Sequence, residues 1–410
     1  MLLCMLYMIE AVFFYWLLYK STNDVLNPFA ISLGAWLGAA GISQLNIGGI
    51  LPDWELMTHI TVQAFALTVL LIGSRGNKPS GKYYYSNLEI KINNKFIIAS
   101  RVIFLVSFIC ALIEWQSNGF VITIFNSSTA DLKGDMIALS GIHYGTVCLP
   151  YCALVSLYEI YFRKNKKKST WIYNISVIAS CVFYSLFIEL SRGSMLIIIL
   201  GGILLTHSRF RIKFSKLVRY ALILTLLMVI LMMIRIQNRD SFIYTATGTY
   251  EWWSPIYLYV ATCFDNLNTL IKNGTPMTLC YATVLKPILD VFNIDLNIPI
   301  IEYNYSFFNA RTMIYSFYHD LGIIGVIIYS FIIYMVVSRI YRRAKYDSRY
   351  LLLLAALQKS IYMVFFGNYF TGVFCPSFPF IVIWFLGIIS QTNIVIGRYG
   401  RAKSVKCLQK

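Results

Sequence analysis

Long stretches of apolar residues recur along the whole chain and are separated by short polar segments. Runs of about 18 or more apolar residues are long enough to cross a bilayer as helices. The pattern predicts eleven such spans, at about 2–19, 28–46, 56–73, 96–113, 141–162, 171–190, 193–207, 217–236, 312–337, 350–366 and 376–396. The sequence therefore predicts an all-α, polytopic integral membrane protein.

One long polar, aromatic-rich stretch interrupts this pattern before the last three spans. Aromatic side chains such as Trp252 and Trp253 are typical of helices that lie at the level of the lipid headgroups. We therefore expect four parts in the chain. They are an N-terminal membrane bundle of about eight spans (1–236), a large extracytoplasmic loop with interfacial helices (237–311), a C-terminal membrane bundle of three spans (312–396) and a basic cytoplasmic tail (397–410).

The charged residues are few and unevenly placed. Only 13% of the residues are charged, against about a quarter in a soluble domain. Most of the basic residues fall in five clusters, at about 75–95, 163–168, 209–219, 339–349 and 398–410. The predicted spans put all five on one side, which the positive-inside rule assigns to the cytoplasm. The N-terminus and the long loop are then outside, the C-terminus is inside, and the net charge of +17 reflects topology and contact with anionic lipids, not nucleic-acid binding.

The densest group of polar residues lies at the outer end of the span predicted at 312–337. Its members are Arg311, Tyr315, Tyr318, His319 and Asp320. At helical spacing Arg311 and Tyr315 share a face, as do Tyr315, Tyr318 and His319. Asp320 would enter the outer third of the membrane, where an ionised group is costly and usually functional. The alternative is a polar helix end in which Gly322 and Gly325 allow close helix packing.

Isolated arginines are predicted on the outer side, where topology does not explain them. Arg192 lies in a turn between two spans, and Arg235 and Arg239 are one helical turn apart. Like charges at this spacing repel unless an anion lies between them. Together with Arg311 they would form a pocket for a diphosphate, because a guanidinium binds oxyanions through two parallel hydrogen bonds. The alternative is a set of arginines that anchor helix ends at the interface.

The remaining candidates are less specific. Glu251 and Asp265 lie near aromatic residues in the long loop, as sugar-binding carboxylates often do. Lys359 lies within a span and is expected to pair internally or to relay ions. A disulfide between Cys263 and Cys280 is left open. The chain shows no zinc-type Cys/His spacing and no phosphate-binding glycine loop, so we expect no metal or other cofactor and a donor substrate already in the membrane.

The architecture and three motifs resemble the oligosaccharide repeat-unit polymerases of bacterial surface polysaccharides (O-antigen polymerase, Wzy-type). The motifs are Ser191-Arg192-Gly193 at the start of a span, the segment from Phe317 to Gly325 and, more weakly, Asp265-Asn266-Leu267. The spacing from Arg311 to Gly322 also matches an arginine–glycine spacing of that family. The resemblance implies a GT-C-like fold.

The resemblance also implies a reaction in the bacterial cytoplasmic membrane. A growing glycan of an O-antigen or capsule would pass from undecaprenyl diphosphate to a hydroxyl of a new lipid-linked repeat unit, at the outer face. A chain-length regulator and a repeat-unit flippase would be partners. The implied roles are diphosphate binding by Arg192, Arg311, Arg235 and Arg239, catalysis by Arg311 with His319 or Asp320 as base, and glycan binding by Tyr315, Tyr318, Glu251 and Asp265.

Three other functions fit a polytopic membrane protein. A flippase or transporter of lipid-linked oligosaccharides would need a cationic cavity inside the bundle, yet few charges fall within the predicted spans. A glycan ligase would use the same arginines with a different acceptor. A membrane acyltransferase would draw its acyl donor from the cytoplasm, whereas the candidate residues here are predicted outside. These considerations favour the polymerase.

Overall fold

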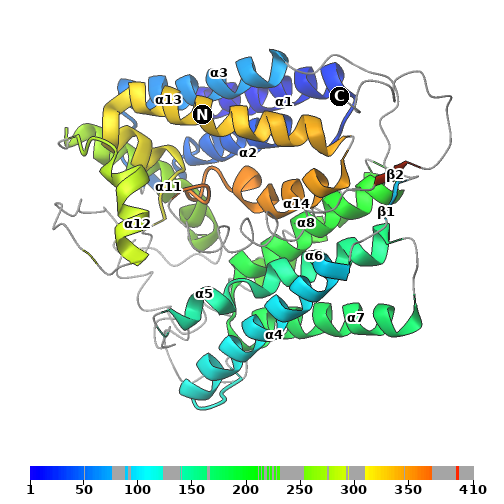
Figure 1. Ribbon diagram of the computed structural model, residues 1–410. Coiled ribbons are helices and arrows are strands. Elements are labelled where there is room, and N and C mark those ends of the chain that lie inside the picture. The colour runs from blue at the N-terminus through cyan, green and yellow to red at the C-terminus, as the bar shows by residue number, and fades with distance from the viewer. Residues whose placement is uncertain are drawn as a thin grey trace.

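The computed structural model describes residues 1–49, 51–75, 88–90, 94–122, 139, 141–163, 167–210, 254–274, 277–291, 294, 310–345, 347–371 and 394–396, with two-residue pieces between 212 and 230. This part is almost entirely helical (Figure 1). The helices are α1 (Leu2–Thr22), α2 (Pro28–Ser43), α3 (Leu56–Arg75), α4 (Asn94–Ser117), α5 (Ile142–Thr146), α6 (Leu149–Phe162), α7 (Lys168–Phe183), α8 (Arg192–Phe210), α11 (Ser254–Lys272), α12 (Lys286–Val291), α13 (Ile314–Ala344) and α14 (Ser348–Tyr362). Two three-residue strands, β1 (Leu88–Ile90) and β2 (Ile394–Ile396), pair antiparallel. Short turns complete the set, a 3-10 turn at Ile47–Gly49 and π-helical turns at Tyr184–Ile188 and Tyr281–Leu285.

Seven helical segments of the described residues are long and apolar enough to cross a membrane. They are Leu2–Thr22, Leu56–Arg75, Phe96–Ser117, Ile142–Phe162, Lys168–Ile188, Arg192–Phe210 and Ile314–Ala344. Each coincides with a span predicted from hydropathy, which confirms a helical, membrane-embedded protein. The predicted span at 28–46 is the shorter apolar helix α2, and the one at 350–366 is the 15-residue α14. The predicted spans at 217–236 and 376–396 lie largely outside the described residues, so the total of eleven stays a prediction.

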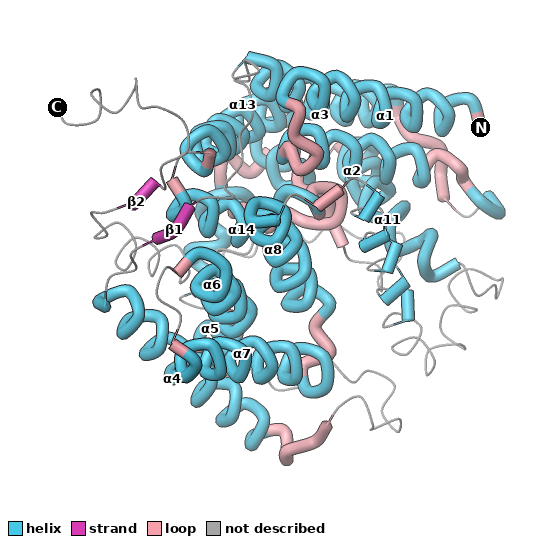
Figure 2. Tube along the Cα trace, turned by 90° about the vertical axis from the view of Figure 1, so that its right-hand side faces the viewer, coloured by secondary structure: helices cyan, strands magenta, loops and turns pink. Residues whose placement is uncertain are grey.

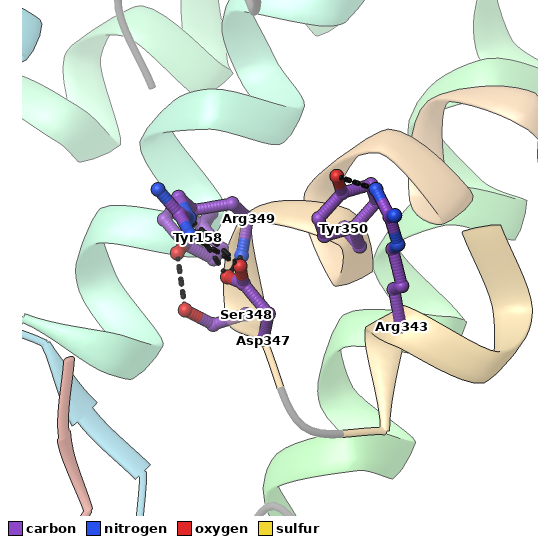
Figure 3. A network of polar contacts seen from close by, with 6 residues as sticks. All are labelled: Tyr158, Arg343, Asp347, Ser348, Arg349 and Tyr350. Carbon is purple, nitrogen blue, oxygen red and sulfur yellow. Dashed lines mark hydrogen bonds and ion pairs between the residues drawn. The ribbon is translucent and has the colours of Figure 1, made fainter. Parts of the chain in front are cut away.

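Contacts between helix ends show that basic residues from several helix ends lie at one end of the bundle. The Tyr341 hydroxyl donates a hydrogen bond of 2.5 Å to the Asp24 carboxylate, which joins the ends of α13 and α1. The Tyr158 hydroxyl donates a 2.9 Å bond to Ser348, which joins the end of α6 to the start of α14 (Figure 3). We call this end, which carries Lys20, Arg75, Arg163, Arg342, Arg343 and Arg349, the basic end.

The start of α14 shows how a helix terminus is held at the basic end. Asp347 is the N-cap, and its carboxylate accepts a bond from the Arg349 amide at 2.9 Å. The Arg349 guanidinium also binds this carboxylate, with Nη2 2.6 Å from Oδ2. Arg343 at the end of α13 donates to the Tyr350 hydroxyl (Figure 3). These contacts fix the turn between α13 and α14, so the two helices run antiparallel.

The two short strands bring distant parts of the chain together. Residues 88–90 follow α3, and residues 394–396 lie close to the C-terminus, yet they pair residue by residue. Figure 1 shows this pair beside the ends of α6 and α8, at the basic end. Residues 88–90 lie in a predicted cytoplasmic loop, whereas residues 394–396, predicted as the cytoplasmic end of the last span, form a strand and not a helix.

An aromatic part of the core lies where α2, α3 and α11 meet. The ring of Trp36 lies 4.6 Å from that of Phe65 and 4.9 Å from that of Phe264, measured between ring centroids. Trp54 also stacks on Phe264, with 5.4 Å between ring centroids. α11 belongs to the stretch predicted as an outer loop with interfacial helices, but residues 261–270 are buried by protein. Its aromatic residues therefore pack on other helices instead of facing lipid headgroups.

Polar side chains tie α11 to the loop before α3. The Oδ1 atom of Asn268 accepts bonds from the Glu55 amide at 2.8 Å and the Thr58 hydroxyl at 2.7 Å, and its Nδ2 donates to the Asp53 carbonyl at 3.1 Å. Asn268 is buried, so these bonds satisfy groups that have no access to water. They hold α11 across the end of the bundle opposite the basic end.

Candidate functional site

The chain reverses between α7 and α8 in only a few residues. α7 ends in the π-helical turn, after which Leu190 takes a positive φ of 47°. The Ser191 hydroxyl then accepts a 3.2 Å bond from the Ser194 amide, as an N-cap does. The Ser194 hydroxyl donates to Glu189 at 3.1 Å, which fixes the turn further. Arg192 is thereby held as the first residue of α8.

The guanidinium of Arg192 lies over an aromatic ring from α11. Its Cζ atom is 4.7 Å from the centroid of the Tyr259 ring, within the range of a cation–π contact. The Tyr259 ring also stacks on Phe366, with 4.3 Å between ring centroids. Three segments far apart in the sequence thus meet at Arg192.

Lys359 of α14 lies beside the same helix start. A Cβ atom built on Gly193 would be only 2.8 Å from the Lys359 Nζ, so glycine leaves room for the ammonium group. The Nζ is also 4.2 Å from the centroid of the Tyr369 ring. Further along, Gly201 of α8 approaches the Ala355 carbonyl, so α8 and α14 pack antiparallel, as Figures 1 and 2 show side by side.

We call Arg192, Lys359, Tyr259, Phe366 and Tyr369 the cation–tyrosine cluster. The N-terminus of α8 adds a partial positive charge to the two cationic side chains. Burial raises the pKa of the Tyr369 phenol, so this ring remains neutral beside the ammonium group. Two half-buried cationic side chains therefore lie at this helix N-terminus, where the Glu189 carboxylate also accepts the Ser194 hydroxyl bond. The arrangement suits an anion such as a phosphate.

Arg311 lies at the same end of the bundle as this cluster. It is exposed, it precedes α13, and its Cζ is 4.9 Å from the centroid of the Tyr315 ring. The segment is anchored by the Met313 amide, which donates a 2.8 Å bond to the Val364 carbonyl. Val364 is two residues from Phe366, so Arg311 and Arg192 approach the segment after α14 from two different elements. Both arginines thus lie at the same end of the bundle, and the diphosphate pocket that they would share stays a prediction.

The first turns of α13 carry three other residues predicted for the site, Tyr315, Tyr318 and His319. The His319 and Tyr315 rings lie edge to face, 6.4 Å apart, so these two of the three residues predicted to share a helix face do so. Tyr315 is 2% exposed, which leaves its ring covered by protein. His319 and Tyr318 are half-buried, and Tyr318 packs against the core. Of this group, His319 is therefore better placed than Tyr315 to meet a substrate.

Asp320 is fully buried and holds another part of the chain. Its carboxylate accepts bonds from the Thr278 hydroxyl at 2.5 Å, the Ala282 amide at 2.8 Å and the Thr283 amide at 3.0 Å. The last two amides belong to the first turn of the helical segment Tyr281–Val291. A carboxylate at that position caps the helix and complements its dipole. The geometry therefore gives Asp320 a positioning role. The sequence predicts either His319 or Asp320 as the catalytic base.

The helix axis breaks directly after Asp320. Leu321 has φ −141° and ψ 22°, and Gly322 has φ 60° and ψ −146°, a conformation open almost only to glycine. A Cβ on Gly325 would lie 2.2 Å from the Phe317 carbonyl oxygen. Both glycines therefore permit the break within α13, a role that differs from the close helix packing given as the alternative. From Ile323 to Ala344 the helix is about 33 Å long, enough for one membrane crossing.

The break in α13 also explains how residues 277–291 are attached to this helix. Without the break, the carbonyls of His319 and Asp320 would bond within the helix. Instead they accept bonds from the Thr278 amide at 3.0 Å and the Leu279 amide at 3.2 Å. The 277–291 segment is thus joined to α13 by backbone and side-chain bonds together.

The remaining predicted residues are distributed differently. Asp265 is 1% exposed within α11, so its carboxylate is not at a surface where a glycan could bind. Arg235, Arg239 and Glu251 lie outside the described residues. Cys263 and Cys280 are both free thiols, one buried and one exposed, so the disulfide left open is not formed. Among the described residues, no group of three or more His, Cys, Asp or Glu side chains could hold a metal ion.

The sequence did not indicate three members of the cluster. Tyr259, Phe366 and Tyr369 are ordinary aromatic residues in an aromatic-rich chain, and only tertiary packing puts them beside Arg192 and Lys359. The one signal was the lysine itself, because a charge within a span usually has a function. No family model, curated protein or solved structure matches this chain.

Proposed function

We propose that this protein polymerises undecaprenyl-diphosphate-linked repeat units into a bacterial surface polysaccharide, an O-antigen or a capsule, and is a metal-independent membrane glycosyltransferase. The observation that carries the proposal is the pairing of Arg192 and Lys359 at the start of α8, with Arg311 at the same end of the bundle. This end is opposite the basic end, where ordinary topology explains the positive charge. The resemblance of the surrounding motifs to the polymerases supports the same reaction.

In this proposal the diphosphate groups of the two lipid-linked substrates are held by different cations. Arg192 and Lys359 bind the diphosphate of the donor, and Arg311 binds that of the acceptor. The acceptor hydroxyl oxygen attacks the anomeric carbon of the donor glycan, and the bond from that carbon to the diphosphate oxygen breaks. The diphosphate keeps the electron pair, and fixed cations stabilise the charge that develops on it. Arg235 and Arg239 are expected to assist.

His319 is proposed to accept the proton of the acceptor hydroxyl, because it is half-buried one turn from Tyr315 and close in sequence to Arg311. Asp320 is fully buried, and its carboxylate accepts three bonds from the 277–291 segment. We therefore assign it to positioning, since it fixes the backbone immediately after His319. Tyr318 is half-buried whereas Tyr315 is buried, so Tyr318 is the stronger of the two tyrosine candidates for glycan contact.

The location follows from the charge distribution. We propose that the protein lies in the bacterial cytoplasmic membrane, with the basic end in the cytoplasm and the cation–tyrosine cluster at the outer face. The N-terminus of α1 is then outside. A repeat-unit flippase would supply both substrates at the outer leaflet, and a chain-length regulator would be a further partner. Accessibility of single cysteines to a membrane-impermeant reagent would test this orientation.

The function is tested by the size distribution of surface polysaccharide in cells that lack the protein. We expect the surface polysaccharide of these cells to contain a single repeat unit. Longer chains should return when the wild-type gene is restored. Arg192→Ala and Lys359→Ala should each lower polymer synthesis by about 100-fold or more, the usual effect of removing one group that stabilises transition-state charge. Arg339→Ala is the matched control, because Arg339 is an exposed arginine at the basic end.

Each other outcome identifies a different function. Full-length polymer with the Arg192→Ala/Lys359→Ala double variant at normal protein levels would overturn the proposal. Complete loss of surface glycan, with lipid-linked units trapped in the cytoplasmic leaflet, would indicate a flippase. Accumulation of long lipid-linked polymer that is not transferred further would indicate a glycan ligase.

A further inference from the structure

The basic end carries a groove between α3 and α13 that the proposed reaction does not use. The two helices run side by side, as both Figure 1 and Figure 2 show. The groove has a volume of about 310 Å³. Its apolar walls include Leu71 and Ile72 of α3 and Ile327 and Phe331 of α13. Leu71, Ile327 and Phe331 are exposed, so the groove opens on the outer surface of the bundle.

Two arginines line the same groove at the basic end. Arg75 is the last residue of α3, and Arg342 lies in the last turn of α13. Arg342 Nε donates a 3.4 Å bond to the carbonyl oxygen of Ser338. Ser338 also lines the groove, so this bond keeps the guanidinium beside the groove. A guanidinium has five N–H donors, and one such bond leaves the others for an oxyanion. None of the described residues that line the groove is acidic.

We propose that this groove binds one anionic glycerophospholipid. Arg75 and Arg342 hold the headgroup phosphate, and the apolar walls of α3 and α13 hold part of one acyl chain. Such a ligand matches both features of the groove, since it joins an anionic group to a long apolar chain. An uncharged lipid would leave the arginines unused, and a free phosphate would leave the apolar walls unused. The site lies at the end of the bundle opposite the cation–tyrosine cluster and is independent of the proposed reaction.

The test measures lipid binding by the purified full-length protein in a neutral detergent. Dioleoylphosphatidylglycerol is titrated and bound lipid is counted by native mass spectrometry, with dioleoylphosphatidylcholine and inorganic phosphate as comparison ligands. An arginine at a membrane surface contributes about a fivefold preference for anionic lipid. We therefore expect Arg75→Ala/Arg342→Ala to weaken binding of phosphatidylglycerol by roughly thirtyfold.

A matched control separates the groove from general surface charge. Arg219→Ala/Arg339→Ala removes the same charge from exposed positions that do not line the groove, and its binding should stay close to wild type. A second variant, Ile327→Trp, fills the groove and keeps both arginines. Because Ile327 is 44% exposed, the larger ring should not prevent folding, and we expect bound lipid to be lost.

Several results would overturn the proposal. Equal weakening in the groove double variant and the control double variant would mean that lipid binds only through general charge. Equal binding of phosphatidylcholine would remove the role of the arginines. Binding of inorganic phosphate as tight as that of the lipid would remove the role of the apolar walls, as would unchanged lipid binding in Ile327→Trp.

Discussion

Replacing Asp320 by alanine removes a side chain that joins α13 to the 277–291 segment. The carboxylate is fully buried and accepts three bonds of 2.5 to 3.0 Å. Alanine leaves two backbone amides and the Thr278 hydroxyl without this acceptor. A hydrogen bond to a charged group is worth about 1.5–3 kcal/mol, and part of that loss is recovered by relaxation. We expect the variant to be less stable by about 3–5 kcal/mol.

The assay is thermal unfolding of the purified protein in detergent, together with hydrogen exchange of the amides in the segment. Because the Ala282 and Thr283 amides lose their acceptor, their exchange should rise well above the wild-type rate. Asp53→Ala is the control, since Asp53 is an exposed carboxylate at the same end of the bundle and its loss should change neither readout.

The result also separates a positioning role from a catalytic one. A catalytic base would show loss of activity in Asp320→Asn, with wild-type unfolding temperature and wild-type exchange of the segment. A positioning residue would change the exchange in both variants, because asparagine offers only one oxygen acceptor and a donor that opposes the second amide. Wild-type exchange and unfolding in Asp320→Ala would refute the reasoning.

Two further substitutions test the backbone around the site. Gly322→Ala should cost about 1–3 kcal/mol, because it forces a methyl group into the positive-φ conformation at the break, and Gly38→Ala in α2 is its control, with open space for the added methyl. The measurement is the shift in unfolding temperature, and an equal effect of the two substitutions would contradict the break. Asn268→Ala should destabilise the protein by about 2–4 kcal/mol, because it leaves the buried Thr58 hydroxyl and two backbone groups without their partner. Proteolysis within the loop before α3 should become faster, and an unchanged cleavage rate would exclude the role given to Asn268.

Much of the fold was predictable because its causes are local. Hydropathy over about 20 residues places a helix in the membrane without knowledge of its neighbours. The seven long apolar helices accordingly lie where the apolar runs predicted them. Charge clusters between alternate spans also predicted which helix ends gather together, and the contacts from Tyr341 to Asp24 and from Tyr158 to Ser348 agree.

The long polar stretch shows where local reasoning fails. α11 is polar enough to read as an outer loop, since Thr262, Asp265, Asn266 and Asn268 interrupt its apolar residues. These polar groups are satisfied or enclosed by other helices, so the helix is buried despite its composition. Burial of a polar helix depends on partners that lie more than 200 residues away, as Asn268 and Thr58 do.

The sequence by itself determined that the protein is helical and membrane-embedded, which helix ends are basic, and that Arg192, Arg311, His319 and Asp320 are unusual for their surroundings. Only the tertiary structure decided what these residues contact. It placed Lys359 beside Arg192, made Asp320 the cap of a distant helix, and assigned Gly322 to a break in α13. The physical reason is that hydropathy and helical periodicity act over neighbouring residues, whereas a site is made by side chains that only packing brings together.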